Sequence, residues 1–222
     1  FGVDAALFYD QSRFDMVPDA IKNATLAPNP SFMLLYEDPL TLVFEKDLEG
    51  VPLAAHYADV ADEFAALAAK TTGELKPMAE HYAILAAVLR DKCAWREKAP
   101  GIVRDGDRAA AFEMAALADR LIVELRRFAD SWYDLWMANN HPQGFDVLDI
   151  RIGAQIRRME TAARRMHAFA EGELDTIAEM EKEKLPYTVE REWWYLPYHG
   201  GTGKVGRFGP WAGCITAEFL GY

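Results

Sequence analysis

Apolar residues recur at helical spacing along most of the chain from residue 56 to residue 170. The first stripe has intervals of 3, 4 and 3 residues and consists of Tyr57, Val60, Phe64 and Leu67. After the break "TTGELKP", a second stripe with intervals of 4, 3 and 4 consists of Met78, Tyr82, Leu85 and Leu89. Residues three or four positions apart share one face of an α-helix, so each stripe predicts an amphipathic helix with one buried face.

Two longer stripes follow. We interpret "APGIVRDGD" as the loop that ends the second helix, and Asp105 or Asp107 as the N-cap of the third. The third stripe runs from Ala110 to Leu135, which predicts a helix on the order of 45 Å long that ends at "NNHPQG". The fourth stripe consists of Leu148, Ile152, Ile156, Met159, Ala163, Met166 and Ala170.

Short turns between long amphipathic helices return the chain beside itself, which favours an antiparallel bundle. The predicted fold class is mainly α: an antiparallel bundle of long helices with an irregular, partly β-like C-terminal tail. We divide the chain into a linker with short helices (1–55), the bundle (56–185) and a Gly- and aromatic-rich tail (186–222) that packs on the bundle or on a neighbour. In the linker, "YEDPLTLVF" predicts a helix, because Asp38 is a favourable N-cap and Pro39 suits the first helical position.

Charge and cysteine content narrow the function classes. With 24 basic and 35 acidic residues the net charge is −11, which repels polyphosphates and anionic lipids, so we expect neither nucleic acid nor a membrane as partner. No apolar run approaches the roughly 18 residues that a membrane-spanning helix needs. The two cysteines, Cys93 and Cys214, fit a reducing, cytoplasmic location. The chain starts without an initiator Met, so we expect a piece of a longer protein whose missing start would hide any signal peptide.

No motif in the chain predicts a cofactor, a metal or a catalytic centre. The stretch "GTGKVG", Gly201 to Gly206, matches a dinucleotide-binding fingerprint, but that fingerprint needs a strand before it and a helix after it, and only 16 residues follow. None of the five histidines has Glu three residues before it, which excludes the usual di-metal site of helical bundles. The signatures His-Glu-x-x-His and Gly-x-Ser-x-Gly are absent as well. We therefore expect no cofactor and no catalytic residue here.

The stretch "NNHPQGFDVLDIRIG" places Asp146, Asp149 and Arg151 within six residues after a Pro-Gly turn. On a helix the two aspartates, three residues apart, could form an acid/base pair. The structural interpretation explains more: Asp146 sits where an N-cap belongs and Asp149 at the third helical position, so the two satisfy exposed N–H groups reciprocally at the positive end of the helix dipole. We predict that they form a structural cap.

The fourth predicted helix is rich in basic residues: Arg151, Arg157, Arg158, Arg164 and Arg165. In an acidic chain they indicate acidic partners, and we favour structural or interface pairing over ligand binding, because nothing else in the segment forms a pocket. In the same helix Gly153 costs about 1 kcal/mol relative to Ala, which predicts a close approach by another helix. In the tail, Trp193, Trp194 and Tyr195 could stack on a sugar, although such residues are more often core or interface anchors.

The sequence "NNHPQGFDVLDIRIGA" resembles the C-terminal helical region of bacterial family-20 glycoside hydrolases, the exo-acting β-N-acetylglucosaminidases. In that family a similar run reads Asn-Lys/Arg-Pro-x-Gly-Phe/Leu-Asp-Val-x-Asp-Ile-Arg-Ile/Leu-Gly-Gly. The matching residues are Asn140, Pro142, Gly144, Phe145, Asp146, Val147, Asp149, Ile150, Arg151, Ile152 and Gly153. The segment from Arg157 to Tyr187 is similar to the family's next helix, acidic turn and Leu-Pro segment, and "NPSFMLLYEDPLTLVF" is similar to the link that leaves the barrel. His141 replaces a basic residue and Ala154 a glycine, and His141 would make a contact at that position pH-sensitive.

The resemblance implies an upstream catalytic (β/α)8 barrel in the same polypeptide, whose Asp-Glu pair removes terminal β-linked N-acetylhexosamine with participation of the substrate's acetamido group. This chain would be the non-catalytic helical domain, which packs on the barrel, supports a homodimer and either borders the active site or stays remote from it. Carbohydrate would bind through the barrel. The candidate interface or substrate-adjacent residues are Asn140, His141, Arg151, Arg158 and Trp194. Two alternatives remain open: a stand-alone helical scaffold or binding module, and an autonomous enzyme that uses Asp146, Asp149 and His141.

Overall fold

The computed structural model describes residues 11–16 and 30–184. Within these ranges the chain forms five α-helices and no strand, which confirms the mainly α fold class. The α-helices are α2 (Pro30–Tyr36), α3 (Leu53–Lys70), α4 (Lys76–Asp105), α5 (Arg108–Asn139) and α6 (Phe145–Glu171). Two short 3-10 helices are η1 (Gln11–Phe14) and η2 (Gly73–Leu75). The predicted tail, with Trp193, Trp194, Tyr195 and "GTGKVG", lies outside the described residues.

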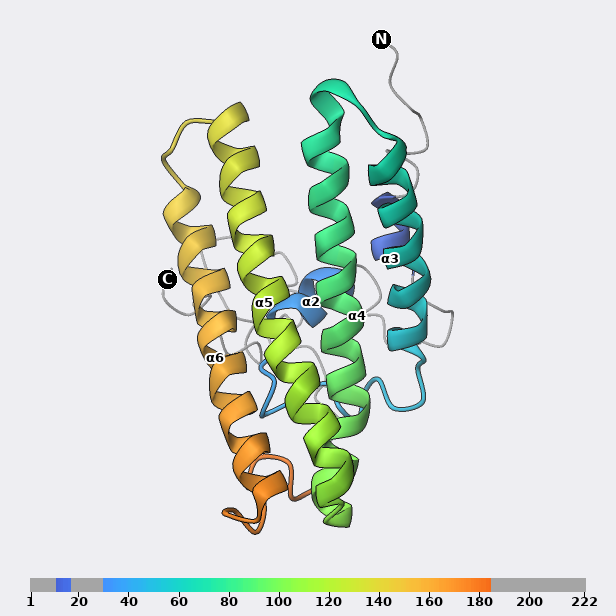
Figure 1. Cartoon of the computed structure of the whole chain (residues 1–222), viewed down its shortest axis with the longest axis vertical. Coiled ribbons are helices and arrows are strands. Elements are labelled where there is room, and N and C mark those ends of the chain that lie inside the picture. The colour runs from blue at the N-terminus through green and yellow to red at the C-terminus, as the bar shows by residue number, and fades with distance from the viewer. Residues whose placement is uncertain (1–10, 17–29, 185–222) are drawn as a thin grey trace, which may run out of the picture.

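The four long helices lie side by side in chain order (Figure 1). α3 packs on α4, α4 on α5 and α5 on α6. The α3–α4 and α5–α6 connections lie at one end of this row and the α4–α5 connection at the other, so neighbouring helices are antiparallel, as the short turns predict. α2 crosses behind α4 and α5 in this view and contacts α4. One face of the row is therefore covered by the segment that precedes α3.

The predicted apolar stripes form much of the core. Of the first stripe, Tyr57, Val60 and Phe64 are buried. The buried face of α5 includes Met114, Leu117, Leu121, Leu125 and Phe128. Each such side chain contributes about 1.5–3 kcal/mol by leaving water, which outweighs the weak helix preferences of single residues. None of the described helices combines the length and the apolar character that a membrane span requires.

The predicted end of the second helix at "APGIVRDGD" is wrong. α4 continues through Pro100 to Asp105 and ends at Gly106, whose φ of 69° is left-handed. Pro100 removes one intrahelical hydrogen bond, yet its side chain is buried and the helix continues for five more residues. Asp107 accepts the N–H of Ala110 at 2.9 Å, which confirms one of the two predicted N-caps of α5.

The predicted helix at "YEDPLTLVF" is also wrong. Residues 37–50, which we call the turn segment, form turns instead of a helix. Asp38 does accept the N–H groups of Leu40 and Thr41, at 3.0 and 2.9 Å, as an N-cap would. A helix does not follow, because Leu42 has a φ of 42°, in the left-handed region that interrupts helical backbone.

Candidate functional site

The turn between α5 and α6, residues 140–144, is organised by Trp136. The Trp136 Nε1 donates a hydrogen bond to the His141 carbonyl oxygen at 2.7 Å. Its ring centre lies 6.0 Å from that of Phe145. The backbone of Gly144 passes close to the same ring, since a Cβ there would lie 3.7 Å from it, and its φ of 93° is left-handed. The corner is therefore a well-packed turn in which glycine is required by the backbone conformation.

The predicted Asp146–Asp149 cap is wrong. The N-cap of α6 is Gly144, and no side chain forms a cap hydrogen bond there. Because the left-handed glycine starts the helix at Phe145, Asp146 lies inside the first turn and Asp149 falls in the second. The charge of Asp146 still lies near the positive end of the helix dipole. Both carboxylates are exposed, so the corner lacks the desolvated pair that is typical of acid/base catalysis.

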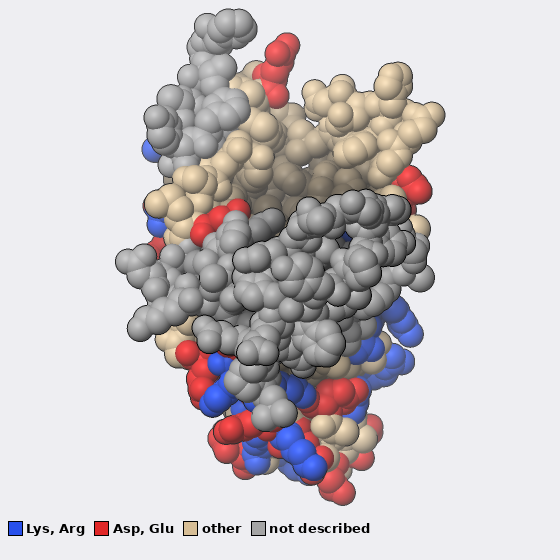
Figure 2. Space-filling view, turned by 180° about the vertical axis from the view of Figure 1, so that it is seen from behind, with Lys and Arg blue, Asp and Glu red and all other residues tan. Residues whose placement is uncertain are grey.

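Exposed apolar side chains surround this turn. Tyr133 on α5, which packs against Phe145 at 5.3 Å, is half exposed, and so are Val147 and Ile150 on α6. The predicted interface candidates Asn140 and His141 are exposed on the turn itself. We call these five exposed residues the corner surface: Tyr133, Asn140, His141, Val147 and Ile150. On the face that Figure 2 shows, side chains at this end of the molecule are mostly uncharged, whereas charged side chains gather at the opposite end.

Nothing described packs against Gly153, on the next turn of α6. No heavy atom lies within 4 Å of the Cβ that another residue would have there. Among the described residues, the predicted close approach of another helix at Gly153 is therefore wrong. The position is exposed, because it points away from the face of α6 that packs in the core.

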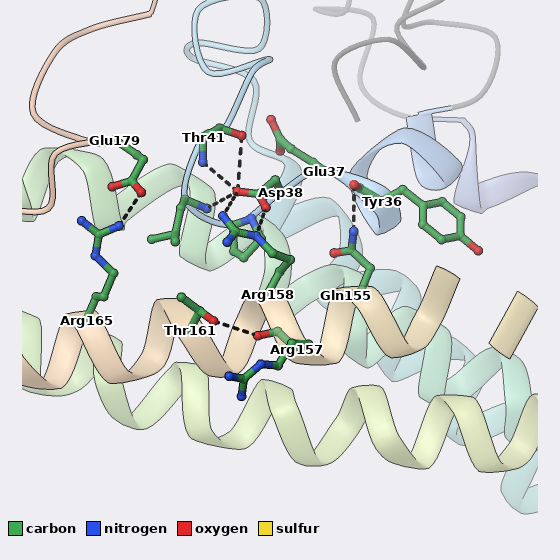
Figure 3. Close-up of polar contacts among 12 residues, drawn as sticks. Tyr36, Glu37, Asp38, Thr41, Gln155, Arg157, Arg158, Thr161, Arg165 and Glu179 are labelled. Carbon is green, nitrogen blue, oxygen red and sulfur yellow. Dashed lines mark hydrogen bonds and ion pairs between the residues drawn. The ribbon is translucent and has the colours of Figure 1, made fainter. Parts of the chain in front are cut away.

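The arginine face of α6 pairs with acidic residues of the same chain. Arg158 binds both carboxylate oxygens of Asp38 in the turn segment, with its Nη2 3.1 Å from Oδ1. About two turns further on, Arg165 forms an ion pair with Glu179 (Figure 3). The predicted structural pairing is therefore present within the chain at these two positions. The acidic partners lie in segments outside the long helices.

Asp38 is buried and charged. Burial alone would raise the pKa of its carboxyl, but hydrogen bonds from Arg158, Thr41 and Leu40 outweigh burial and place the pKa below its ordinary value. The hydrogen bond to Asp38 in turn raises the pKa of the Arg158 guanidinium. An arginine that is committed to a buried carboxylate fastens the turn segment to α6, which favours a structural role for Arg158 over contact with a substrate.

The end of α2 is held by α6 as well. The Gln155 Nε2 donates to the Tyr36 carbonyl oxygen at 2.9 Å (Figure 3). The guanidinium carbon of Arg151, a predicted interface candidate, lies 5.9 Å from the centre of the Tyr36 ring. This distance is within the range of a cation–π contact. Arg151 thus lies on the face of α6 that contacts α2.

A second buried group of charges joins α2, α4 and α6. The Lys92 Nζ donates to the carbonyl oxygens of Leu35 and Glu37, at 2.8 and 2.9 Å, and to the Gln155 Oε1 at 2.8 Å. The Arg96 Nε donates to the Glu37 Oε2 at 2.9 Å. We call Glu37, Lys92, Arg96 and Gln155 the buried network. All four are less than one-tenth exposed, so each charge depends on the others for the solvation that water no longer supplies.

The buried network is not among the predicted sites, although the sequence of α4 carries a signal for it. The apolar stripe that we trace to Leu89 continues at the same helical intervals with Lys92 and Arg96. Charged residues on the core face of a helix require buried partners. Glu37 supplies the carboxylate for Arg96, and backbone carbonyl oxygens and Gln155 accept from Lys92. In residues 11–16 and 30–184, no group of three or more His, Cys, Asp or Glu side chains is placed to hold a metal ion.

The comparison with protein families now identifies the chain. The family model described as Glycoside Hydrolase 20C C-terminal domain matches residues 6–193. The chain belongs to this family. It is therefore a helical, non-catalytic C-terminal domain of a family-20 glycoside hydrolase, and the family implies a catalytic domain in the same polypeptide. No curated protein matches the chain significantly. The resemblance carried by "NNHPQGFDVLDIRIGA" is thus confirmed.

Proposed function

We propose that this C-terminal domain packs on the catalytic (β/α)8 barrel of its own polypeptide and joins two subunits into a homodimer, with the corner surface as the contact between subunits. The parent enzyme would remove terminal β-linked N-acetylhexosamine, and this domain would support its assembly without taking part in the chemistry. The observation that carries the proposal is the corner surface: Tyr133, Val147 and Ile150 stay exposed on a turn that is itself well packed. Exposed apolar groups on a rigid support are typical of protein contacts.

Electrostatics favours the same surface. The chain carries a net charge of −11, so two copies repel each other over most of their surfaces. A dimer is opposed least where few charged side chains face the partner. On the face that Figure 2 shows, the end of the molecule that carries the corner has fewer charged side chains than the opposite end, and the exposed carboxylates near the corner include Asp146 and Asp149. Asn140 and His141 on the turn add hydrogen-bonding groups to the rim of this contact.

The other candidate interface residues differ in what they contact. Arg151 lies close to α2, and Arg158 is committed to Asp38, so both support the domain's own structure. A contact of Asn140 or His141 with substrate requires that the corner reach an active site, of its own barrel or of the partner's. The roles of Trp194 and the cytoplasmic location stay predictions.

Light scattering on the 222-residue chain and on the parent enzyme tests the proposal. Ile150→Asp places a charge on the corner surface and should weaken the dimer by about 2 kcal/mol or more, roughly 30-fold in its dissociation constant. Val123→Asp is the matched control, because Val123 is 55% exposed on α5 and Ile150 53% exposed on α6. The control should leave the dimer unchanged.

Two results would contradict the proposal. Equal dimer dissociation constants for Ile150→Asp and the unaltered chain would remove the corner surface from the interface. Hydrolysis of a chromogenic N-acetylglucosaminide by the 222-residue chain alone would contradict the assignment of all catalysis to the barrel.

A further inference from the structure

The first described element, η1, is anchored on α3. Phe14 of η1 is 4% exposed, and its ring centre lies 5.0 Å from that of Phe64 on α3. The Tyr57 hydroxyl donates to the Phe14 carbonyl oxygen at 2.8 Å. The Arg13 guanidinium forms an ion pair with Glu63, also on α3. The path of the chain is therefore fixed at η1, beside the helix that forms one edge of the row (Figure 1).

The family match places the catalytic domain close to η1. The match is to a C-terminal domain, so the catalytic domain lies upstream in the polypeptide. The match begins at residue 6 and η1 begins at Gln11, which leaves about five residues between the catalytic domain and η1. Five residues span at most about 18 Å when they are fully extended. A catalytic domain on so short a connection has to lie beside η1 and the edge of the row that η1 is anchored on.

The outer side of α3 is exposed along four turns. Five exposed residues recur there at intervals of 4, 3, 4 and 3, on the side opposite the buried stripe of the same helix: Ala55, Asp59, Asp62, Ala66 and Ala69. Next to η1, Met16 is 68% exposed, more than any other large apolar side chain in residues 11–16 and 30–184. We call Met16 and these five residues of α3 the junction surface. The solvent side of a helix is usually polar, so an exposed methionine beside three exposed alanines is typical of a surface that another domain covers.

The size of the junction surface fits a contact between domains. From Ala55 to Ala69 the exposed side of α3 is about 21 Å long and about 10 Å wide. With η1 beside it, the surface is on the order of 300 Å², and contacts between domains bury from about 600 Å² over both sides. The carboxylates of Asp59 and Asp62 are exposed on it, so a partner face with lysine or arginine is complementary.

We propose that the catalytic domain of the same polypeptide packs on the junction surface and places lysine or arginine opposite Asp59 and Asp62. The inference rests on the proposed function for the packing of the two domains and names the surface that they use. α3 and α6 form opposite edges of the row of helices (Figure 1). A catalytic domain on α3 therefore leaves the corner surface open to the second subunit.

The test is hydroxyl-radical footprinting of the parent enzyme, with the oxidation rate of each side chain measured by mass spectrometry. Met33 is 2% exposed and serves as the reference for a covered methionine. We expect Met16 to be oxidised about as slowly as Met33, because the catalytic domain covers it. Without that cover, Met16 would be oxidised at least about fivefold faster than Met33, since oxidation follows exposure.

Two variants of the parent enzyme test the contact directly. Ala66→Arg adds a long, positively charged side chain that clashes with the packed domain and repels its basic groups, so it should raise the oxidation rate of Met16 at least about fivefold. Asp59→Lys should raise the same rate, because it removes the charge complementarity. The matched controls are Ala116→Arg and Asp130→Lys, which change an exposed alanine and an exposed aspartate of α5 and should leave the rate of Met16 unaltered.

Three outcomes overturn the inference. Oxidation of Met16 at least about fivefold faster than that of Met33 in the unaltered parent enzyme would show that the junction surface is open. Equal Met16 rates in Ala66→Arg and the unaltered enzyme would remove α3 from the contact. An unchanged rate in Asp59→Lys would contradict a basic partner face.

The same footprint separates these results from a failure of the proposed function. Protection of Phe112, which is 51% exposed on α5, with an open junction surface would mean that the domains pack through another face. That result would overturn the inference and leave the proposed packing intact. Free oxidation of both Met16 and Phe112 and of all other exposed side chains outside the corner surface would contradict the packing itself. Light scattering reads the dimer independently of both.

Discussion

Replacing Lys92 with Met should destabilise the domain by about 3–5 kcal/mol. The Nζ of Lys92 is the shared donor for three acceptors, the carbonyl oxygens of Leu35 and Glu37 and the Gln155 Oε1, all within 2.9 Å. Met fills a similar volume but donates no hydrogen bond, so three buried acceptors lose their partner. Each hydrogen bond to a charged group contributes about 1.5–3 kcal/mol, and removal of one member of a buried charged group costs about 3–5 kcal/mol in total.

Urea unfolding followed by circular dichroism measures this loss. With an unfolding free energy of about 10 kcal/mol, in the middle of the usual range of about 5–15 kcal/mol, the midpoint should fall by roughly a third to a half while the m-value stays the same. Lys98→Met is the matched control, since Lys98 is an exposed lysine in the same helix, and it should change the unfolding free energy by no more than about 0.5 kcal/mol. If Lys92→Met also changed it by no more than about 0.5 kcal/mol, the buried network would not hold α2 to the bundle.

Two further predictions concern His81 and the corner. Burial lowers the pKa of His81 to about 4 from 6.5, so the unfolded chain takes up a proton between these pH values that the folded chain does not. The stability that neutral His81 contributes is complete above pH 6.5 and is lost as the pH falls towards 4, by up to about 3 kcal/mol. Thermal melts of His81→Phe should therefore show a midpoint that depends less on pH between these values. An equal pH dependence of the midpoint in His81→Phe and the unaltered chain would contradict this prediction. Gly144→Ala should lower the unfolding free energy by about 1–2 kcal/mol because of its φ of 93°, whereas Gly153→Ala should raise it by up to about 1 kcal/mol. Equal chemical denaturation midpoints for these two variants would contradict the strain at Gly144.

The sequence predicts the helices well because apolar residues at helical spacing lie on one face of each helix, and that face is the one that the fold buries. The apolar stripe of α5 from Ala110 to Leu135 corresponds to a single helix, Arg108–Asn139. The predicted boundaries fail where tertiary packing overrides a local signal. Pro100 predicts the end of a helix from the sequence alone, yet α4 continues past this buried residue to Asp105.

The candidate site is predicted in part. The Pro-Gly turn and its exposed Asn140 and His141 follow from the sequence. The N-cap residue of α6 does not, because both Gly144 in left-handed conformation and Asp146 are favourable N-caps, and only the backbone shows that Gly144 has this position. The pairing of Arg158 with Asp38 could not be located from the sequence either. Its two members are 120 residues apart, and nothing local connects them.

That separation sets the order in which the domain is completed during synthesis. Asp38 leaves the ribosome long before Arg158, and at 5–20 residues per second the interval is roughly 6–24 s. The α3–α4 hairpin needs only near neighbours and assembles early. Glu37 and Glu45 of the turn segment can pair with Arg96 and Arg104 as soon as α4 has formed, whereas Asp38 has no arginine partner until the last long helix arrives. The turn segment is therefore fixed in two steps, first to α4 and then to α6.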